Sequence, residues 1–146
     1  MFEITTSVEI AATPQRVWSV LLDFAAHPRW NPFVRSISGI PIVGERLTVV
    51  MQPVGGKAMT FRPTILVVAP AQELRWLGRF LFAGIFDGEH YFRIVPIASD
   101  RVRFEHGERF SGVLVPLAKS SLTGGTRAGF VAMNEALKAR AESNEP

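Results

Sequence analysis

The sequence contains no cysteine and no cluster of basic residues, since its 16 lysines and arginines are scattered singly along the chain. Without cysteine there is no disulfide framework, no thiolate metal site and no cysteine nucleophile. Without a basic cluster there is no electrostatic footprint of a nucleic-acid-binding surface, so we expect no nucleic-acid partner. The absence of cysteine suits a reducing compartment, and we expect a cytoplasmic protein.

Long apolar runs are also missing. No stretch approaches the ~18 consecutive apolar residues that would cross a membrane, and the first ten residues, MFEITTSVEI, alternate in polarity instead of forming a signal peptide. We therefore expect no stable membrane insertion. No nucleophile elbow, phosphate-cradling glycine loop or zinc motif occurs, so we expect no cofactor and no bound metal.

What the chain has is length and aromatic side chains. Its 146 residues, 47% of them hydrophobic, suffice for one domain with a sizeable core. Eleven phenylalanines, three tryptophans and one tyrosine exceed the needs of a thin core, which hints at a lined cavity. We expect a single domain over residues 1–146, frayed at residues 143–146.

The N-terminal third predicts one strand and two short helices. Apolar and polar residues alternate over residues 2–10, which is typical of a strand with one wet face. Thr13 and Pro14 then give a hydroxyl N-cap and a proline at the first helical position, and the apolar stripe that follows continues to about Phe24. Residues 25–33 predict a second short helix or turn, broken by Pro28 and Pro32, with Trp30 directed inward.

The rest of the chain predicts strands and then a long helix. Turns bearing glycine or proline separate six predicted strands, at residues 34–40, 45–52, 58–68, 73–82, 85–97 and 101–112. In residues 58–68 both parities are apolar, which leaves the inward face undecided. Residues 111–121 predict a loop or lid, and residues 122–141 a helix with Phe130, Met133 and Leu137 on one face. Because short-linked strands are antiparallel and a one-sided apolar helix needs a sheet to cover, the sequence predicts an α+β fold. A curved sheet of about seven strands should wrap around the C-terminal helix.

This order, and several local patterns, resemble the SRPBCC superfamily of START-like proteins, which have the helix-grip fold. The chain is similar to small bacterial members described as polyketide cyclase/dehydrase and lipid transport-like. The matching stretches are TPQRVWSVLLDFAAHPRWNPFV, LRWLGR, GEHYFRIVP, ERFSGVLVP and GFVAMNEALKARAE. The resemblance implies an apolar cavity between the sheet and the C-terminal helix, with its mouth near residues 111–121 and Trp30.

The stretch FDGEHYFRIVPIASDRVRFEHGERF, residues 86–110, carries the candidate polar site. Strand alternation places His90, His106 and Glu108 on the same inward face as the aromatic residues. A three-residue turn at residues 98–100 would set Arg93 opposite Glu105, and opposite charges favour that register. The same register sets His90 opposite Glu108, His106 opposite Phe92, and Ile94 opposite Phe104.

Four interpretations of this polar group remain open. His90 and Glu108 could anchor a mostly apolar ligand, since pockets commonly carry a few polar groups in an apolar wall. They could satisfy one another as a structural pair. They could act as an acid/base pair, with Glu108 fixing the imidazole tautomer and His90 moving a proton. A two-histidine, one-carboxylate metal site is the fourth interpretation, but the placement of His106 opposite Phe92 argues against it. We favour the ligand anchor.

The sequence thus predicts binding of a small, largely hydrophobic ligand, lipid-, polyketide- or aromatic-like, in an internal cavity. The expected ligand-binding residues are Trp30, Trp76, Phe80, His90, Phe92, Phe104, His106, Glu108, Phe110, Phe130 and Met133. The alternative is a polyketide cyclase/aromatase- or dehydrase-like enzyme in which His90 and Glu108 form the catalytic proton-transfer pair. A protein-interaction module would need an exposed apolar groove, which the mixed charges on the outer strand faces disfavour, and the sequence points to no protein partner.

Overall fold

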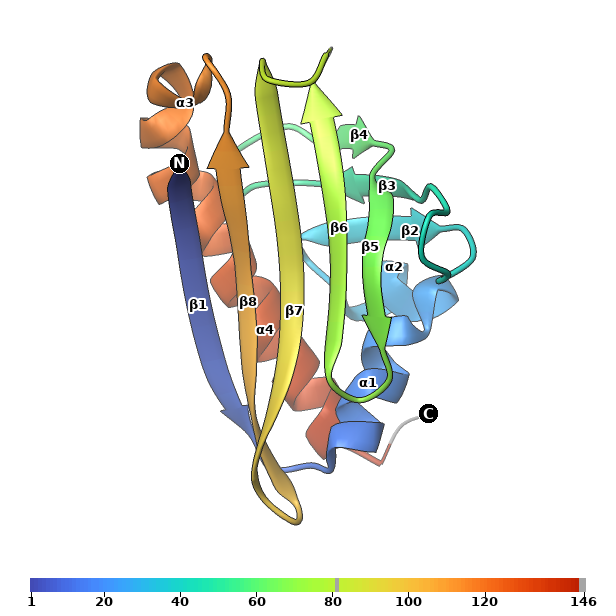
Figure 1. Cartoon of the computed structure of the whole chain (residues 1–146). Helices are drawn as coiled ribbons and strands as arrows, with labels where there is room; N and C mark the ends of the chain where they lie inside the picture. The colour runs from blue at the N-terminus through green and yellow to red at the C-terminus, as the bar shows by residue number, and fades with distance from the viewer. Residues whose placement is uncertain (81, 145–146) are drawn as a thin grey trace.

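Five strands form an antiparallel sheet in the order β1-β8-β7-β6-β5 (Figure 1). Their bounds are Phe2–Ile10 for β1, Arg101–Ser111 for β8, Phe86–Ala98 for β7, Glu73–Phe80 for β6 and Thr64–Ala69 for β5. The computed structural model describes residues 1–80 and 82–144. Residue 81, expected at the end of strand 73–82, and residues 145–146, expected in the frayed terminus, lie outside the described residues.

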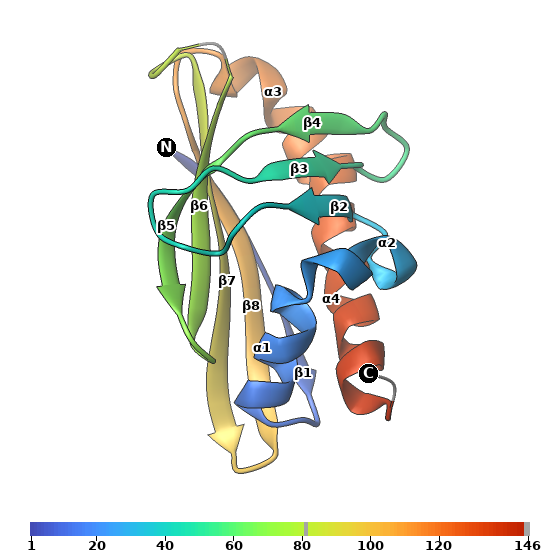
Figure 2. The same ribbon diagram turned by 90° about the vertical axis from the view of Figure 1, so that its right-hand side faces the viewer.

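Three shorter strands form a second antiparallel sheet, which runs across the first (Figure 2). They are β2 (Val34–Ser38), β3 (Thr48–Met51) and β4 (Met59–Phe61). The backbone N–H of Leu47 donates to the Pro63 carbonyl at 2.9 Å, and the N–H of Ile65 donates to the Glu45 carbonyl at 2.9 Å, so the two sheets are joined. The predicted α+β helix-grip fold is confirmed, although the strands of the described residues divide between two sheets instead of forming one.

The predicted strand at residues 58–68 is wrong as a single element. The structure divides it into β4, in the short sheet, and β5, in the long sheet. Pro63 lies at the break, where a residue without an N–H cannot continue a central ladder. The face that the sequence left undecided is settled beyond the break, because Ile65 is buried and Leu66 is exposed.

The helices after β1 are α1 (Pro14–Leu22), the 3-10 turn η1 (Phe24–Ala26) and α2 (His27–Trp30). The Thr13 hydroxyl accepts from the Arg16 backbone N–H at 3.1 Å, which is the N-cap that the sequence predicts.

The segment after α1 is held by His27, which is buried. Its Nε2–H donates to the Leu21 carbonyl at 2.8 Å, and its Nδ1 accepts from the Asn31 side-chain amide at 3.1 Å. The Asn31 Oδ1 in turn accepts from the backbone N–H groups of Phe33 and Val34, both at 2.9 Å. This small network fixes the point at which Phe33 enters the interior.

The C-terminal helix begins earlier than expected. It comprises α3 (Val115–Ser121), a single π turn η2 (Leu122–Thr126) and α4 (Arg127–Glu142), and it runs along one face of the long sheet (Figure 2). The loop or lid predicted at residues 111–121 is therefore mostly helix. Pro116 suggested a loop, but it lies in the first helical turn, where its missing N–H costs no hydrogen bond.

The register predicted for the β7–β8 hairpin is confirmed. His90 pairs with Glu108, Phe92 with His106, and Ile94 with Phe104. The turn differs in one detail, because Ala98 pairs with Arg101 and the strand bulges between Pro96 and Ala98. The predicted Arg93 to Glu105 ion pair forms on the outer face, at 3.7 Å.

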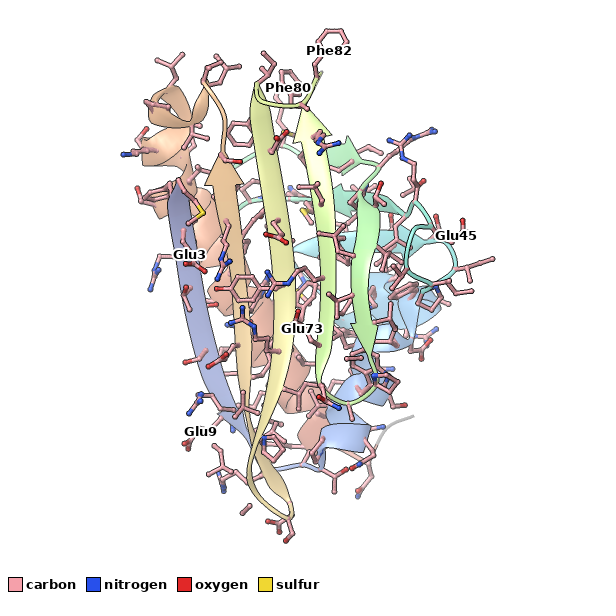
Figure 3. All side chains as sticks on the ribbon, viewed as in Figure 1. Glu3, Glu9, Glu45, Glu73, Phe80 and Phe82 are labelled. Carbon is pink, nitrogen blue, oxygen red and sulfur yellow. The ribbon has the colours of Figure 1, made fainter. Side chains whose placement is uncertain are left out.

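The outer face of the long sheet is charged, and Figure 3 shows Glu3, Glu9 and Glu73 along it. Glu73 accepts from Arg75 at 2.9 Å and from Arg93 at 3.1 Å. The opposite, inner face carries the apolar residues that pack against α4, including the buried Phe104. Side-chain polarity therefore tells the two faces of the sheet apart.

Two adjacent glycines in the π turn test how the short sheet is held to the helix. The Gly125 carbonyl accepts from the Val54 backbone N–H at 3.1 Å, and a Cβ at residue 125 would lie 2.6 Å from the Val54 oxygen. A Cβ at Gly124 would meet nothing within 4 Å. We expect Gly125→Ala to lower the free energy of unfolding by about 1–3 kcal/mol through overpacking. Gly124→Ala should be neutral or stabilising by up to ~1 kcal/mol through helix propensity. Urea unfolding of both variants measures this, and equal stability would contradict the assigned contact.

Candidate functional site

A cavity of about 690 Å³ lies between the long sheet, the β3–β4 hairpin and the helical segment α3–η2. Three sets of mostly apolar side chains form its walls. The sheet contributes Trp76, Gly78, Phe80, Phe86, Gly88, Glu108 and Phe110; the short sheet and its hairpin contribute Met51, Pro53, Val54, Met59 and Phe61; and the helical segment contributes Leu114, Leu117, Ala118, Ser121, Leu122, Gly125 and Thr126. Phe33 also lines it.

The mouth of the cavity is rimmed by exposed apolar side chains. Phe80, which lines the cavity, lies at the end of the sheet where β6 leads into β7 (Figure 3) and is more than half exposed. Leu117, on α3, is 82% exposed although it lines the cavity. Exposed side chains of this kind are typical of a binding site that opens to the outside.

Glu108 is the one acidic residue among the described residues that line the cavity. Its carboxylate lies directly over Gly88, because a Cβ at residue 88 would collide with the Glu108 Oε2. The absence of a side chain at residue 88 thus makes the room that the carboxylate occupies. Its Oε1 bonds the His90 Nδ1 at 2.9 Å, while Oε2 has no hydrogen-bond partner among the described residues.

Behind Glu108, a chain of hydrogen bonds runs through the core. The His90 Nε2 bonds the His106 Nε2 at 2.7 Å, and the His106 Nδ1 bonds the Asn134 Oδ1 at 2.9 Å. The Asn134 amide donates to the Thr6 hydroxyl at 2.9 Å, and that hydroxyl donates to the His106 carbonyl at 2.7 Å. The chain therefore links β8, β7, α4 and β1.

The donor and the acceptor of each hydrogen bond in this series can be assigned by starting from Thr6. Because the Thr6 hydroxyl donates its hydrogen to a carbonyl, it can only accept from Asn134. The Asn134 Oδ1 then accepts from the His106 Nδ1–H, which leaves the His106 Nε2 as an acceptor. The His90 Nε2 must supply the proton of the next hydrogen bond.

The environment of His106 agrees with this assignment. Complete burial lowers the pKa of His106 well below its usual value, and the neighbouring His90 lowers it further. Hydrogen bonds to Asn134 and to the Phe130 backbone act in the opposite direction but are weaker. His106 is therefore neutral near pH 7.

The expected site residues other than Trp30 divide into two groups. Those that line the cavity are Trp76, Phe80, Glu108 and Phe110. Those that lie in the packed core behind its wall are His90, Phe92, Phe104, His106, Phe130 and Met133, each at most 1% exposed. Strand alternation brings the strand residues of both groups to one face of the sheet, but those of the second group are packed against α4, which contributes Phe130 and Met133.

Trp30 belongs to neither group. It lies at the end of α2 with its ring tilted against that of His27, at 4.8 Å between the ring centroids, and it does not line the cavity. Of the two places expected at the cavity mouth, residues 111–121 contribute to the cavity lining and Trp30 does not. The chain turns at Asn31, so Phe33 and not Trp30 reaches the cavity.

Several residues of the candidate site are not among those expected from the sequence. Asn134 is a polar residue on the apolar face of the helix, next to Met133, and that position was the available signal for a buried partner. Thr6 and the hairpin residues from Pro53 to Lys57 gave no comparable signal, because their roles depend on contacts between distant segments.

The polar group does not resemble a metal site. The two histidines bond each other through their Nε2 atoms, which occupies the nitrogens that a shared metal would need. Across the residues that the structure describes, no three His, Asp or Glu side chains are grouped so that they could hold a metal ion. Across the same residues, no helix is long and apolar enough to span a membrane.

The free energy of unfolding should depend on pH because two histidines, His27 and His106, are buried. Burial also lowers the pKa of His27, against the opposing effects of the Leu21 carbonyl and Asp23. Because His27 and His106 are neutral in the folded state and protonate near pH 6.5 when unfolded, the unfolded state binds more protons below that pH. We expect the free energy of unfolding to fall between pH 6.5 and pH 5, by up to about 1.4 kcal/mol per pH unit for each histidine.

Chemical unfolding at several pH values from 7.5 to 5 measures this effect. The carboxyl groups of Glu3, Glu73 and Glu142 have lowered pKa values, so their stabilising contribution is lost only below the usual carboxyl range and falls outside this window. The variant His27→Gln should show a shallower slope. A free energy of unfolding that stays constant from pH 7 to pH 5 would contradict the neutral, buried state of both rings.

The comparisons with known proteins agree with this architecture. Solved structures similar to the chain include a START superfamily protein from Mycobacterium smegmatis, at 22% identity and TM-score 0.72, covering 96% of this chain and 97% of that one. The Zhui aromatase/cyclase from a Streptomyces species is similar at 16% identity and TM-score 0.78, covering 97% and 93%. A norcoclaurine synthase from Thalictrum is similar at 16% identity and TM-score 0.71, covering 96% and 93%. At these identities the likeness concerns the fold alone.

The sequence itself matches one family. A search of curated proteins finds no match. The family described as polyketide cyclase / dehydrase and lipid transport matches residues 1–142, which is nearly the whole chain. The chain therefore belongs to the polyketide cyclase/dehydrase and lipid transport family.

Proposed function

We propose that the protein binds a small, largely hydrophobic molecule in the cavity between the sheet and the α3–η2 segment. The observation that carries this proposal is the cavity itself. Its volume of about 690 Å³ falls within the range of roughly 300–1,000 Å³ that is typical of small-molecule sites, and its walls are aromatic and aliphatic. A lipid-, polyketide- or aromatic-like molecule fits this chemistry.

The small polar content of the walls supports binding of an apolar molecule with one polar end. Glu108 lies among Trp76, Phe86 and Phe110, while the basic residues Lys57 and Arg79 are exposed. An apolar body would pack against the aromatic wall, and its polar end would reach Glu108. Family membership supports the same reading, since the family description includes lipid transport.

A cyclase- or dehydrase-like reaction is a second candidate, and the hydrogen bond between Glu108 and His90 favours it. The two groups are 2.9 Å apart, which is a good distance for sharing a proton. Because His90 is completely buried, only Glu108 could touch a substrate. In such an enzyme Glu108 would be the catalytic acid or base, and His90 would position it.

Filling the cavity tests the binding proposal. Ala118 lines the cavity on α3, whereas Ala139 is exposed on α4 and serves as the matched control. We expect the neutral fluorescent probe N-phenyl-1-naphthylamine to bind the wild type saturably. Ala118→Phe should weaken that binding by about tenfold or more, because it displaces the probe's contacts, while Ala139→Phe should leave it unchanged.

Fluorescence titration gives the dissociation constants, and thermal unfolding confirms that each variant is folded. Native mass spectrometry with a panel of lipids, flavonoids and aromatic polyketides then identifies the preferred ligand class. Absence of saturable binding by the wild type, or equal weakening by both alanine variants, would count against the cavity as the binding site.

A further inference from the structure

The number of protons that His90 and Glu108 share determines whether Glu108 can donate or accept a hydrogen bond with a ligand. The His90 Nε2–H is committed to His106, so one proton remains for the contact between the His90 Nδ1 and the Glu108 Oε1. That proton can reside on the carboxyl group, beside a neutral imidazole, or on the ring, beside a carboxylate. The pair has zero net charge in both arrangements.

The second oxygen of Glu108 is the same in both arrangements. The shared proton lies on the side of Oε1, so Oε2 carries no hydrogen whichever group holds it. Oε2 lies over Gly88 on the cavity wall and has no hydrogen-bond partner among the described residues. In both arrangements the cavity therefore presents a bare hydrogen-bond acceptor.

Building on the binding function proposed above, we infer that Glu108 selects ligands whose polar group is a neutral hydrogen-bond donor, such as the hydroxyl of a phenol or an enol. A ligand whose polar group can only accept leaves Oε2 buried and unpaired, which costs binding free energy. A cationic group gains little from a pair of zero net charge, and Lys57 and Arg79 on the walls repel it. A neutral hydroxyl satisfies the oxygen without either cost.

His90 and Gly88 act on this selectivity by positioning the carboxylate. His90 holds Oε1 and so directs Oε2 to the cavity, while Gly88 leaves the space in which Oε2 lies. His90 is itself fixed through His106 and Asn134. The specificity of the cavity thus depends on side chains that no ligand touches.

The test compares two probes that differ in one hydrogen-bond donor, 1-hydroxypyrene and 1-methoxypyrene. We expect the wild type to prefer 1-hydroxypyrene by about tenfold in Kd, the effect of one hydrogen bond to a charged or proton-sharing group. Glu108→Leu removes the acceptor and keeps a side chain of similar size. The ratio of the two Kd values in this variant therefore gives the baseline, which reflects only the different sizes of the probes. The preference should fall to that baseline. The cationic probe 1-pyrenemethylamine should bind the wild type more weakly than 1-hydroxypyrene.

Glu108→Gln tests the order of the protons. Its amide N–H can donate to the His90 Nδ1, which leaves its carbonyl facing the cavity, so the preference for the hydroxyl should persist. If the protons ran the other way, the amide nitrogen would face the cavity and the preference would reverse, which would overturn the inference. Gly88→Ala keeps every titratable group but displaces the carboxylate, and it should lower the ratio of the Kd values toward the baseline even if Glu108→Leu does not fold.

The outcomes separate the two proposals. If neither pyrene binds the wild type, the proposed binding function fails. If both bind with the same ratio in the wild type and in Glu108→Leu, the cavity binds ligands but Glu108 does not select them, and only this inference fails. A stronger affinity for 1-pyrenemethylamine than for 1-hydroxypyrene would likewise overturn it, because it would mean a net negative charge at Glu108.

Discussion

The hydrogen-bond chain from Glu108 to Thr6 sets where the C-terminal helix lies against the sheet. It brings two imidazoles and an amide into an apolar core, where any one of them left unpaired would cost about 1–3 kcal/mol. All of these costs are avoided only when α4 lies at one position relative to β1, β7 and β8. The apolar contacts of Phe130 and Met133 hold the helix against the sheet, but such contacts tolerate small shifts. The polar chain does not, so it defines the register between helix and sheet.

With the helix in that register, the interior consists of a packed core on one side of Glu108 and a cavity on the other. Around His106 the rings of Phe92 and Phe130 pack within 5 Å, centroid to centroid. On the cavity side of Glu108, two positions of the sheet are glycines, Gly78 and Gly88, so the sheet carries no side chain there. The π turn at residues 122–126 frees the Gly125 carbonyl to hold the β3–β4 hairpin across the opening. The cavity thus results from local features of the backbone, each of which is a small residue or an irregular turn.

The sequence predicted the architecture well, because the features that determine it are periodic. Alternation gave the faces of β7 and β8, and paired charges gave their register, so His90 was correctly placed opposite Glu108. Periodicity failed where proline had two possible meanings, at Pro63, which ends a strand, and at Pro116, which starts a helix. It also could not separate cavity wall from packed core, because Phe110 and Phe104 occupy equivalent inward positions on β8. Only the path of the helix across the sheet, a contact between distant segments, decides which of them has empty space in front of it.

The difference in exposure between Glu108 and His90 bears on how one family includes both carriers and enzymes. A fold does not fix a chemistry, so the distinction must lie in the site. Here the polar part of the candidate site is a carboxylate that is hydrogen-bonded to a completely buried imidazole ring. For a ligand that only needs a hydrogen bond, this arrangement supplies a fixed acceptor. For a ligand with an acidic C–H or a hydroxyl leaving group, the same oxygen could accept or return a proton while His90 compensates the charge. Carrier and catalyst would then differ in the ligand supplied, with no change in the residues that hold it.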